Sequence, residues 1–395
     1  MPSVKSKNLT VFYAFIQGLY WMNFAAIMGY SGYYLLAKDF SNTEIGIIIA
    51  VAGIISAILQ PVLASYADHP QSPSLKKLMQ LLLLLQLIFG ILLLFVQIPT
   101  VIGLLYGCSI ALLQILTPFI SALGMESINQ GNNLNFGLAR GLGSVAYAGL
   151  SYVLGIVTSW TGASAVPIFV MLITLSLTGV VALFPFTKVV ASTAPKSQAA
   201  SNSSNPLVFF RKYKRFSLVL LGCIFIYVSH VLLNNFTYQI IESKGGGSAQ
   251  MGTATAIAAM CELPTLFLFS FIVRKIRCDI LLRISGIFYA IKAIGSLLAP
   301  NVLTYYSVQT LQMLGWGLMT VVSVYYVNII MEKEDVIKGQ AYFTMTYTLG
   351  SVAAAFIGGA LIDISGVNAM LIFSVISVVI GAIIVFLAAE RTPVK

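Results

Sequence analysis

Twelve long apolar runs constrain the fold of this chain more than any other feature. Each is close to the ~20 residues that a helix needs to cross a lipid bilayer. A polar stretch at 189–213, which begins VVASTAPKSQAASNSSNP, cannot bury a core and divides the runs into two groups of six. We therefore predict an all-α integral membrane protein with twelve transmembrane helices in two six-helix lobes, 1–188 and 214–395. The runs cover about 10–36, 43–66, 76–96, 99–128, 137–160, 164–187, 214–242, 250–274, 279–299, 302–331, 338–362 and 367–389.

The composition excludes a soluble protein. The 395 residues are 58% hydrophobic and only 9% charged, whereas a soluble chain carries about 25% charged residues. The net charge of +10 suits the cytoplasmic face of a membrane better than nucleic acid. The sequence contains no phosphate-binding loop, nucleophile elbow or metal-ligand spacing. We therefore expect neither an enzyme nor a pump, and neither a cofactor nor a metal.

The basic residues predict the orientation. If the N-terminus is cytoplasmic, eighteen Lys and Arg residues fall on the inner side, and the outer loops receive only Lys38 and Lys244. Such a bias is typical of a multi-pass protein of the plasma (inner) membrane with both termini in the cytoplasm. We expect no cleaved signal peptide, and we expect a monomer.

Six plus six spans around a central cytoplasmic loop are typical of two-lobed secondary transporters, which bind their substrate near the membrane midplane. The same layout fits a membrane sensor or scaffold that binds a ligand without moving it. Within transport, either a sugar carrier or a carrier of drugs or aromatic acids fits the span pattern. The residues inside the spans must distinguish these classes.

Four charged residues lie inside or at the edges of spans: Glu126, Arg140, Glu262 and Lys292. An ionisable side chain at that depth costs roughly 2.5–3.5 kcal/mol on insertion scales, so it is usually paired or functional. The signs balance, with one acid and one base in each half of the chain. We interpret both pairs as candidates for substrate or ion binding, with a purely structural salt bridge as the alternative.

Polar and aromatic residues gather at the same depths. Amides and hydroxyls beside rings suit a sugar, whose hydroxyls need hydrogen-bond partners while its C–H face stacks on an aromatic ring. His230 is also a candidate proton carrier, because an unperturbed histidine titrates near neutral pH. The set comprises Gln17, Tyr20, Trp21, Asn23, Tyr147, Tyr227, His230, Asn234, Asn235, Gln312, Trp316 and Tyr347.

Several segments resemble the lactose permease group of oligosaccharide–proton symporters in the major facilitator superfamily. The most specific is NFGLARGLGSVAY at 135–147, and IMG at 27–29 and Gln60-Pro61 before Asp68 also match. The resemblance implies the major facilitator fold. It also implies that Glu126 and Arg140 bind sugar hydroxyls and that Tyr147 takes the place of a tryptophan that stacks on the sugar.

In the second half, the resemblance implies that Glu262 is an acid that also contacts sugar, and that Lys292 takes the place of an arginine. The departures are equally specific. Gln312 and Gly315 stand where the permeases carry a histidine and a glutamate that are central to sugar binding and proton release. Tyr347 stands in the place of a lysine that pairs with an acid of the seventh helix. Ala64 replaces the glycine of the superfamily's loop motif.

We therefore expect a secondary transporter for a sugar or small oligosaccharide, with proton coupling left open by these departures. Expected substrate-binding residues are Glu126, Arg140, Tyr147, Glu262, Asn234 and Gln312. Expected proton-coupling residues are Glu262, Lys292 and His230, with Glu262 as the first candidate carrier. The segment from Gly339 to Asp363 is similar to relatives assigned to phenylpropionate uptake, which keeps an aromatic acid as the alternative substrate.

Overall fold

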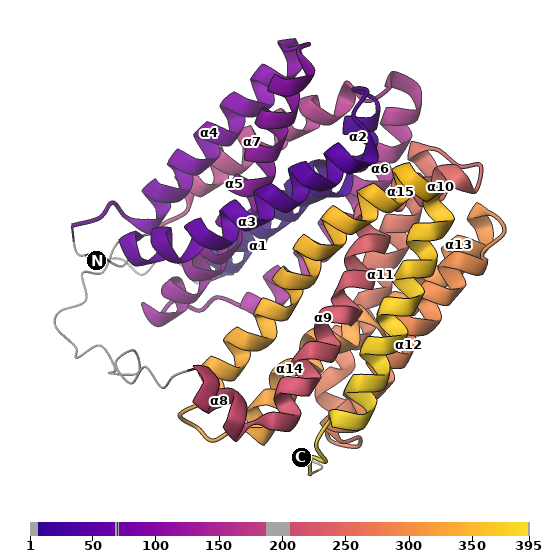
Figure 1. The fold of residues 1–395 in the computed structure, drawn as a ribbon. Helices are drawn as coiled ribbons and strands as arrows, with labels where there is room; N and C mark the ends of the chain where they lie inside the picture. Colours follow the sequence, from indigo (N-terminus) through magenta and orange to yellow (C-terminus); the bar gives the residue numbers. More distant parts are fainter. Residues whose placement is uncertain (1–6, 68, 70, 187–205, 394–395) are drawn as a thin grey trace. The chain divides into compact units, whose positions relative to one another are not determined.

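The computed structural model describes residues 7–67, 69, 71–186 and 206–393, and these residues form helices and connecting turns without a strand (Figure 1). The helices before residue 187 are α1 (Lys7–Phe24), the π-helix η1 (Ala25–Gly29), α2 (Ser31–Leu36), α3 (Asn42–Ala67), α4 (Leu75–Phe95), α5 (Pro99–Asn129), α6 (Phe136–Thr161) and α7 (Ala165–Leu183). Those after residue 205 are α8 (Pro206–Lys212), α9 (Lys214–Asn235), α10 (Thr237–Ser243), α11 (Ser248–Ile272), α12 (Cys278–Leu298), α13 (Val302–Gln309), the 3-10 helix η3 (Thr310–Met313), α14 (Trp316–Ile330) and α15 (Val336–Ala388).

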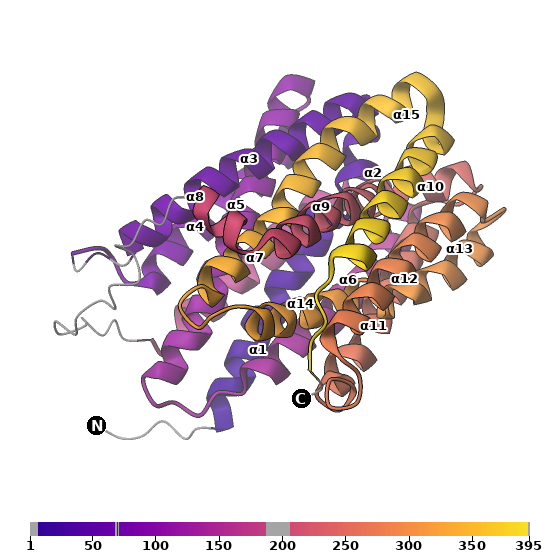
Figure 2. The ribbon, with the colours of Figure 1, turned by 60° about the horizontal axis from the view of Figure 1, so that its bottom comes forward.

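Eleven helical stretches of the described residues are long and apolar enough to cross a membrane. The last, α15, is 53 residues long and contains Gly366 with a left-handed φ of 80°. Because a residue with a side chain rarely adopts this φ, glycine permits the chain to reverse there, as both ribbon views show (Figures 1 and 2). The two arms of α15 match the predicted runs 338–362 and 367–389, so the predicted twelve-span, all-α class is confirmed.

Three predicted runs are interrupted in ways that their hydropathy did not indicate. The first run is divided by the π-helix η1, the seventh is divided at Phe236 between α9 and α10, and the tenth is divided around η3. Most of the predicted linker, 189–205, lies outside the described residues. Its last part is not an irregular loop, because residues 206–212 form α8.

The chain divides into two compact units. Unit 1 comprises Met1–Val190 and Asn235–Met260, and unit 2 comprises Ala191–Asn234 and Cys261–Lys395. Within unit 1, α1 packs against α6 and α7, and α4 packs against α5 and α7. Within unit 2, α12 packs against α14 and α15. The segment 235–260 thus clusters with the first half of the chain, and the division into lobes 1–188 and 214–395 stays a prediction.

Two glycines bring α6 and α11 into backbone contact within unit 1. A Cβ added at Gly252 would overlap the Ser151 carbonyl oxygen, and one at Gly155 would lie 2.8 Å from the Ser248 carbonyl oxygen. The Tyr30 hydroxyl donates to that same Ser151 oxygen over 2.6 Å. Small residues at such crossings allow the backbones of membrane helices to approach closely. The crossing therefore depends on glycine at both positions.

An ion-pair cluster ties α8 to the loop before α15 in unit 2. The Lys212 ammonium lies 2.7 Å from Glu332 and 2.8 Å from Asp335, and the Tyr213 hydroxyl donates to Asp335 over 3.0 Å. Hydrogen bonding to Lys212 lowers the pKa of the Asp335 carboxyl and raises the pKa of Lys212. These contacts hold the end of α8 against the loop that precedes α15.

Candidate functional site

In unit 1, one face of α1 carries a chain of hydrogen bonds. The Trp21 indole N–H donates to the Gln17 side-chain oxygen over 3.1 Å, and the Gln17 amide donates to the Tyr13 hydroxyl over 2.8 Å. Tyr13 in turn donates to the Ile120 carbonyl oxygen of α5 over 3.0 Å. The three side chains share a face because they are spaced by four residues. This series of hydrogen bonds fixes the position of the Trp21 ring.

Arg140 lies on that ring. Its guanidinium carbon is 4.0 Å from the centroid of the Trp21 ring, and its Nη1 donates to the Ser144 hydroxyl over 3.3 Å. A cation over an indole face is stabilised by the ring quadrupole, more strongly where water is excluded. The approach requires Gly143, because a Cβ there would lie 2.6 Å from Trp21 Cδ1. The planar guanidinium is therefore held against the Trp21 ring and the Ser144 hydroxyl.

The other expected residues of unit 1 have different neighbours. The Glu126 carboxylate accepts a hydrogen bond from Gln130 over 3.2 Å. The Tyr147 ring lies 6.5 Å from that of Phe24, and Phe24 lies 5.2 Å from Trp21. Tyr147 thus belongs to the aromatic group around Trp21. Glu126 contacts Gln130, whereas Arg140 contacts Ser144 and Trp21. The two charged residues therefore share no partner among these contacts.

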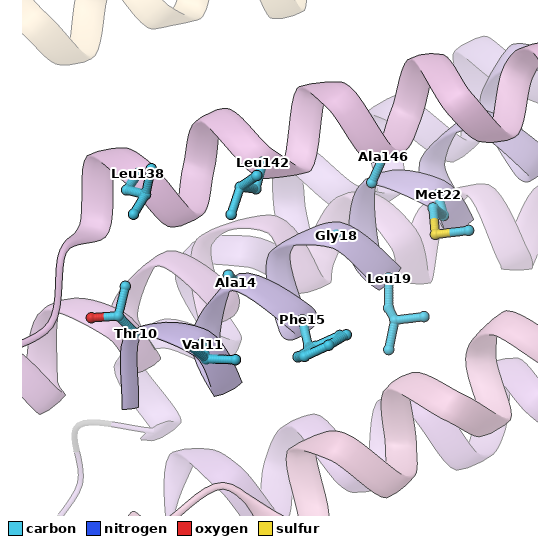
Figure 3. Close-up of a pocket in the computed structure, with 10 residues that line it drawn as sticks. All are labelled: Thr10, Val11, Ala14, Phe15, Gly18, Leu19, Met22, Leu138, Leu142 and Ala146. Atoms are coloured by element: carbon cyan, nitrogen blue, oxygen red, sulfur yellow. The ribbon is translucent and has the colours of Figure 1, made fainter. Parts of the chain in front are cut away.

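An apolar groove of about 500 Å³ is lined by residues of α1 and α6 (Figure 3). It contains none of the expected site residues. Nine of its ten lining residues carry no polar side-chain atom other than sulfur, so it offers almost no hydrogen-bonding group to a sugar. The lining residues are Thr10, Val11, Ala14, Phe15, Gly18, Leu19, Met22, Leu138, Leu142 and Ala146.

In unit 2, the tenth span is broken at its centre. Between α13 and α14 the chain passes through η3, and Gly315 has non-helical angles of φ −80° and ψ −94°. Two hydroxyls bind the carbonyl oxygens at the break: Ser285 donates to Gly315 over 2.8 Å, and Thr265 donates to Met313 over 3.0 Å. Broken membrane helices with satisfied backbone groups typically mark binding sites. Here the break positions Gln312 and Trp316.

Gln312 connects the two charged residues of unit 2. Its side-chain oxygen accepts from the Lys292 ammonium over 2.5 Å, and its amide nitrogen donates to Glu262 over 3.0 Å. Lys292 is only 2% exposed and Gln312 only 4%. The predicted acid and base of the second half are thus brought together through a neutral amide, in the place where the resembling permeases carry a histidine.

Aromatic rings of α9, α12, α14 and α15 pack against one another in unit 2. His230 and Trp316 stack with centroids 4.5 Å apart and planes 6° from parallel. Tyr347 lies 5.5 Å from Trp316 and 5.5 Å from Tyr227. The Asn234 amide donates to the His230 carbonyl oxygen over 2.9 Å. The Tyr227–Tyr347 ring pair joins α9 to α15, the seventh and eleventh spans, between which the acid–lysine pair of the resembling permeases is missing.

Three contributors in unit 2 were not predicted from the sequence: Thr265, Ser285 and Tyr289. Tyr289 packs edge-on to His230 with centroids 5.4 Å apart, and its hydroxyl is buried without a hydrogen-bond partner among the described residues. In the sequence, Thr265 and Ser285 look like ordinary span residues, because their role depends on the helix break whose carbonyl oxygens they bind. For Tyr289 a signal existed, since it lies one helical turn before Lys292.

The fold and these two clusters define a class of protein. Long apolar spans that contain buried, hydrogen-bonded charges are features of a multi-pass membrane transporter. The chain belongs to the MFS_1 like family, whose profile matches residues 8–375. No curated protein sequence matches the chain.

Solved structures of transporters share this fold. The nucleoside transporter NupG is 12% identical, with a TM-score of 0.78 over 98% of each chain, and a point mutant of NupG superposes with a TM-score of 0.82. An auto-inhibited POT family peptide transporter is 10% identical, with a TM-score of 0.76 over 98% of each chain. A bacterial homolog of the human lysosomal transporter Spinster, in an inward-facing unoccupied conformation, is 12% identical, with a TM-score of 0.68 over 98% of each chain. The chain thus has the major facilitator fold.

Proposed function

We propose that this protein is an alternating-access transporter of the plasma membrane, with cytoplasmic termini, for a sugar or small oligosaccharide. The observation that carries the proposal is the Arg140 guanidinium, fixed on the Trp21 ring in a span and joined to Ser144. A fixed guanidinium presents several donors in one plane, which suits vicinal hydroxyls. The resemblance to the lactose permeases supports the same role for Arg140, with Glu126 accepting from hydroxyls and Tyr147 stacking.

Unit 2 supplies the groups for proton coupling. Glu262 is the proposed carrier, since a carboxylate takes up and releases one proton while Gln312 keeps it linked to the Lys292 cation. A nearby cation favours the ionised carboxylate, so any movement that breaks the Gln312 bridge favours proton uptake. His230 is a weaker candidate, because its ring is committed to stacking on Trp316.

An aromatic-acid carrier is the second candidate. The observation that favours it is the buried Lys292 cation in the same unit as the stacked His230 and Trp316 rings, which suits a carboxylate beside a flat group. The structural neighbours include a transporter of nucleosides and one of peptides, so the fold leaves the substrate class to the site residues.

The proposal is tested with purified protein and a panel of monosaccharides, disaccharides and aromatic acids, scored by binding and then by uptake into proteoliposomes. We expect a mono- or disaccharide to bind and to enter, and Arg140→Lys to bind it at least tenfold more weakly, since lysine keeps the charge and loses the planar fork. Binding of aromatic acids alone would favour the second candidate. Binding without flux would identify a sensor.

A further inference from the structure

The interior of unit 2 contains more aromatic surface than a sugar needs. We define the aromatic platform as Tyr227, Trp316 and Tyr347, whose rings lie 5.5–6.2 Å apart and come from α9, α14 and α15. Tyr227 and Trp316 meet at 72° and Tyr227 and Tyr347 at 76°. His230 covers one face of Trp316. In an edge-to-face pair the edge of one ring meets the face of the other, so the pair does not cover both faces of either ring.

Tyr347 is the accessible member of the platform. It is 38% exposed, whereas Tyr227 is 5% exposed. The exposed part lies on a polar stripe of α15, because Gln340, Thr344, Tyr347, Thr348 and Ser351 recur at helical spacing. The exposed apolar residues Met345, Leu349 and Phe356 follow a different stripe, which suits lipid. The exposed tyrosine ring therefore belongs to the polar side of the helix.

Hydrogen-bonding groups flank the platform. Gln312 precedes Trp316 by four residues across the helix break, and it is linked to Glu262 and Lys292. The Tyr289 hydroxyl, on a side chain that is 2% exposed, lacks a partner among the described residues. Buried hydroxyls are normally hydrogen-bonded, so this one is suited to a heteroatom of a ligand or to a water beside it. The helix break, braced by Ser285 and Thr265, holds this arrangement together.

We infer that unit 2 binds a flat aromatic or heteroaromatic ring of the substrate on the aromatic platform. Given the proposed function, on which this statement rests, the transported molecule is a sugar joined to such a ring, an aryl or heteroaryl glycoside. The ring stacks on Tyr347 and Trp316, and the polar groups around Gln312 contact its edge. This goes beyond the resemblance, in which Tyr347 takes the place of a lysine.

The test compares matched methyl and phenyl glycosides of glucose, galactose and xylose, together with phenylpropionate, by titration calorimetry on the purified full-length protein. For a sugar that binds, we expect the phenyl glycoside to bind about tenfold or more tightly than the methyl glycoside. Tyr347→Leu should abolish this preference and leave the affinity for the methyl glycoside within about twofold. Tyr152→Leu, which removes a 48% exposed tyrosine of unit 1, is the control and should keep the preference.

Equal affinity of wild type for the methyl and phenyl glycosides, or a preference that survives in both Tyr347→Leu and Trp316→Leu, would overturn the platform. If phenylpropionate binds in a Tyr347-dependent way and no glycoside binds, the platform stands and the sugar assignment fails. If methyl glycosides bind and the phenyl group adds nothing, the sugar assignment stands and the platform fails. Trp316→Leu provides the second variant in case one of the two does not fold.

Discussion

The Lys292 ammonium donates to the side-chain oxygen of Gln312 over 2.5 Å in the interior of unit 2. The same amide donates to Glu262, so a neutral side chain carries the connection between the two charges. Replacing Gln312 with leucine removes an acceptor from a cation that is 2% exposed. Leaving a buried charge without its partner costs roughly 3–5 kcal/mol, so we expect Gln312→Leu to lower the thermal unfolding midpoint markedly.

The double variant Lys292→Met, Gln312→Leu is the control for that prediction. Because it removes the charge and the amide together, an apolar pair of similar volume should recover most of the lost stability. Thermal unfolding of the wild type, both single variants and the double variant in the same detergent measures the coupling. If the stability losses of the two single variants simply add up in the double variant, Gln312 does not stabilise the Lys292 cation.

The Trp21–Arg140 contact can be tested through the glycine that permits it. Gly143→Ala places a methyl group 2.6 Å from Trp21 Cδ1, so the ring must shift and the guanidinium loses its support. We expect weaker sugar binding, by about tenfold, with an overpacking cost of roughly 1–3 kcal/mol in stability. Gly149→Ala on the same helix, where a methyl group meets nothing within 4 Å, is the matched control. The role of Arg140 would be in doubt if both variants bound sugar like the wild type.

The crossing of α6 and α11 gives a third prediction. A methyl group at Gly252 would overlap the Ser151 carbonyl oxygen and would displace the Tyr30 hydroxyl that binds it. We expect Gly252→Ala to separate the two helices and to expose a cysteine introduced at Ser248 to maleimide. Gly179→Ala, at a position with open space around it, should leave labelling unchanged. Unchanged labelling in Gly252→Ala would contradict the close approach.

The Lys212–Asp335 pair predicts a pH dependence. The pKa of Asp335 is lowered from its ordinary value of 3.8, first by Lys212. A lowered carboxyl pKa means that the folded protein binds fewer protons than the unfolded chain. The stabilisation is therefore present above about pH 3.8 and is lost as the pH falls through the lower, folded-state pKa. Thermal unfolding between neutral pH and pH 3 should show this loss in the wild type but not in Asp335→Asn, and salt should reduce it.

Much of the fold could be predicted from the sequence, because membrane spans are defined by length and apolar character alone. The breaks inside spans could not, since the π-helix after Phe24 and the turn at Gly315 leave hydropathy unchanged. The four intramembrane charges and the polar cluster could be recognised from the sequence because charged and polar side chains are costly, and therefore rare, inside membrane spans. Their partners were not, because the Trp21–Arg140 contact and the Gln312 bridge depend on which helices pack together. Thr265 and Ser285 carried no signal stronger than that of ordinary span residues.

The most direct measurement is sugar uptake into proteoliposomes with an imposed pH gradient and with the gradient collapsed, for the wild type and Glu262→Gln. We predict that the wild type accumulates sugar above equilibrium only with the gradient. Glu262→Gln should exchange sugar across the membrane without accumulating it, because glutamine cannot carry the proton. Equal wild-type flux with and without the gradient, or uphill accumulation by the glutamine variant, would contradict the proposed proton-coupled mechanism.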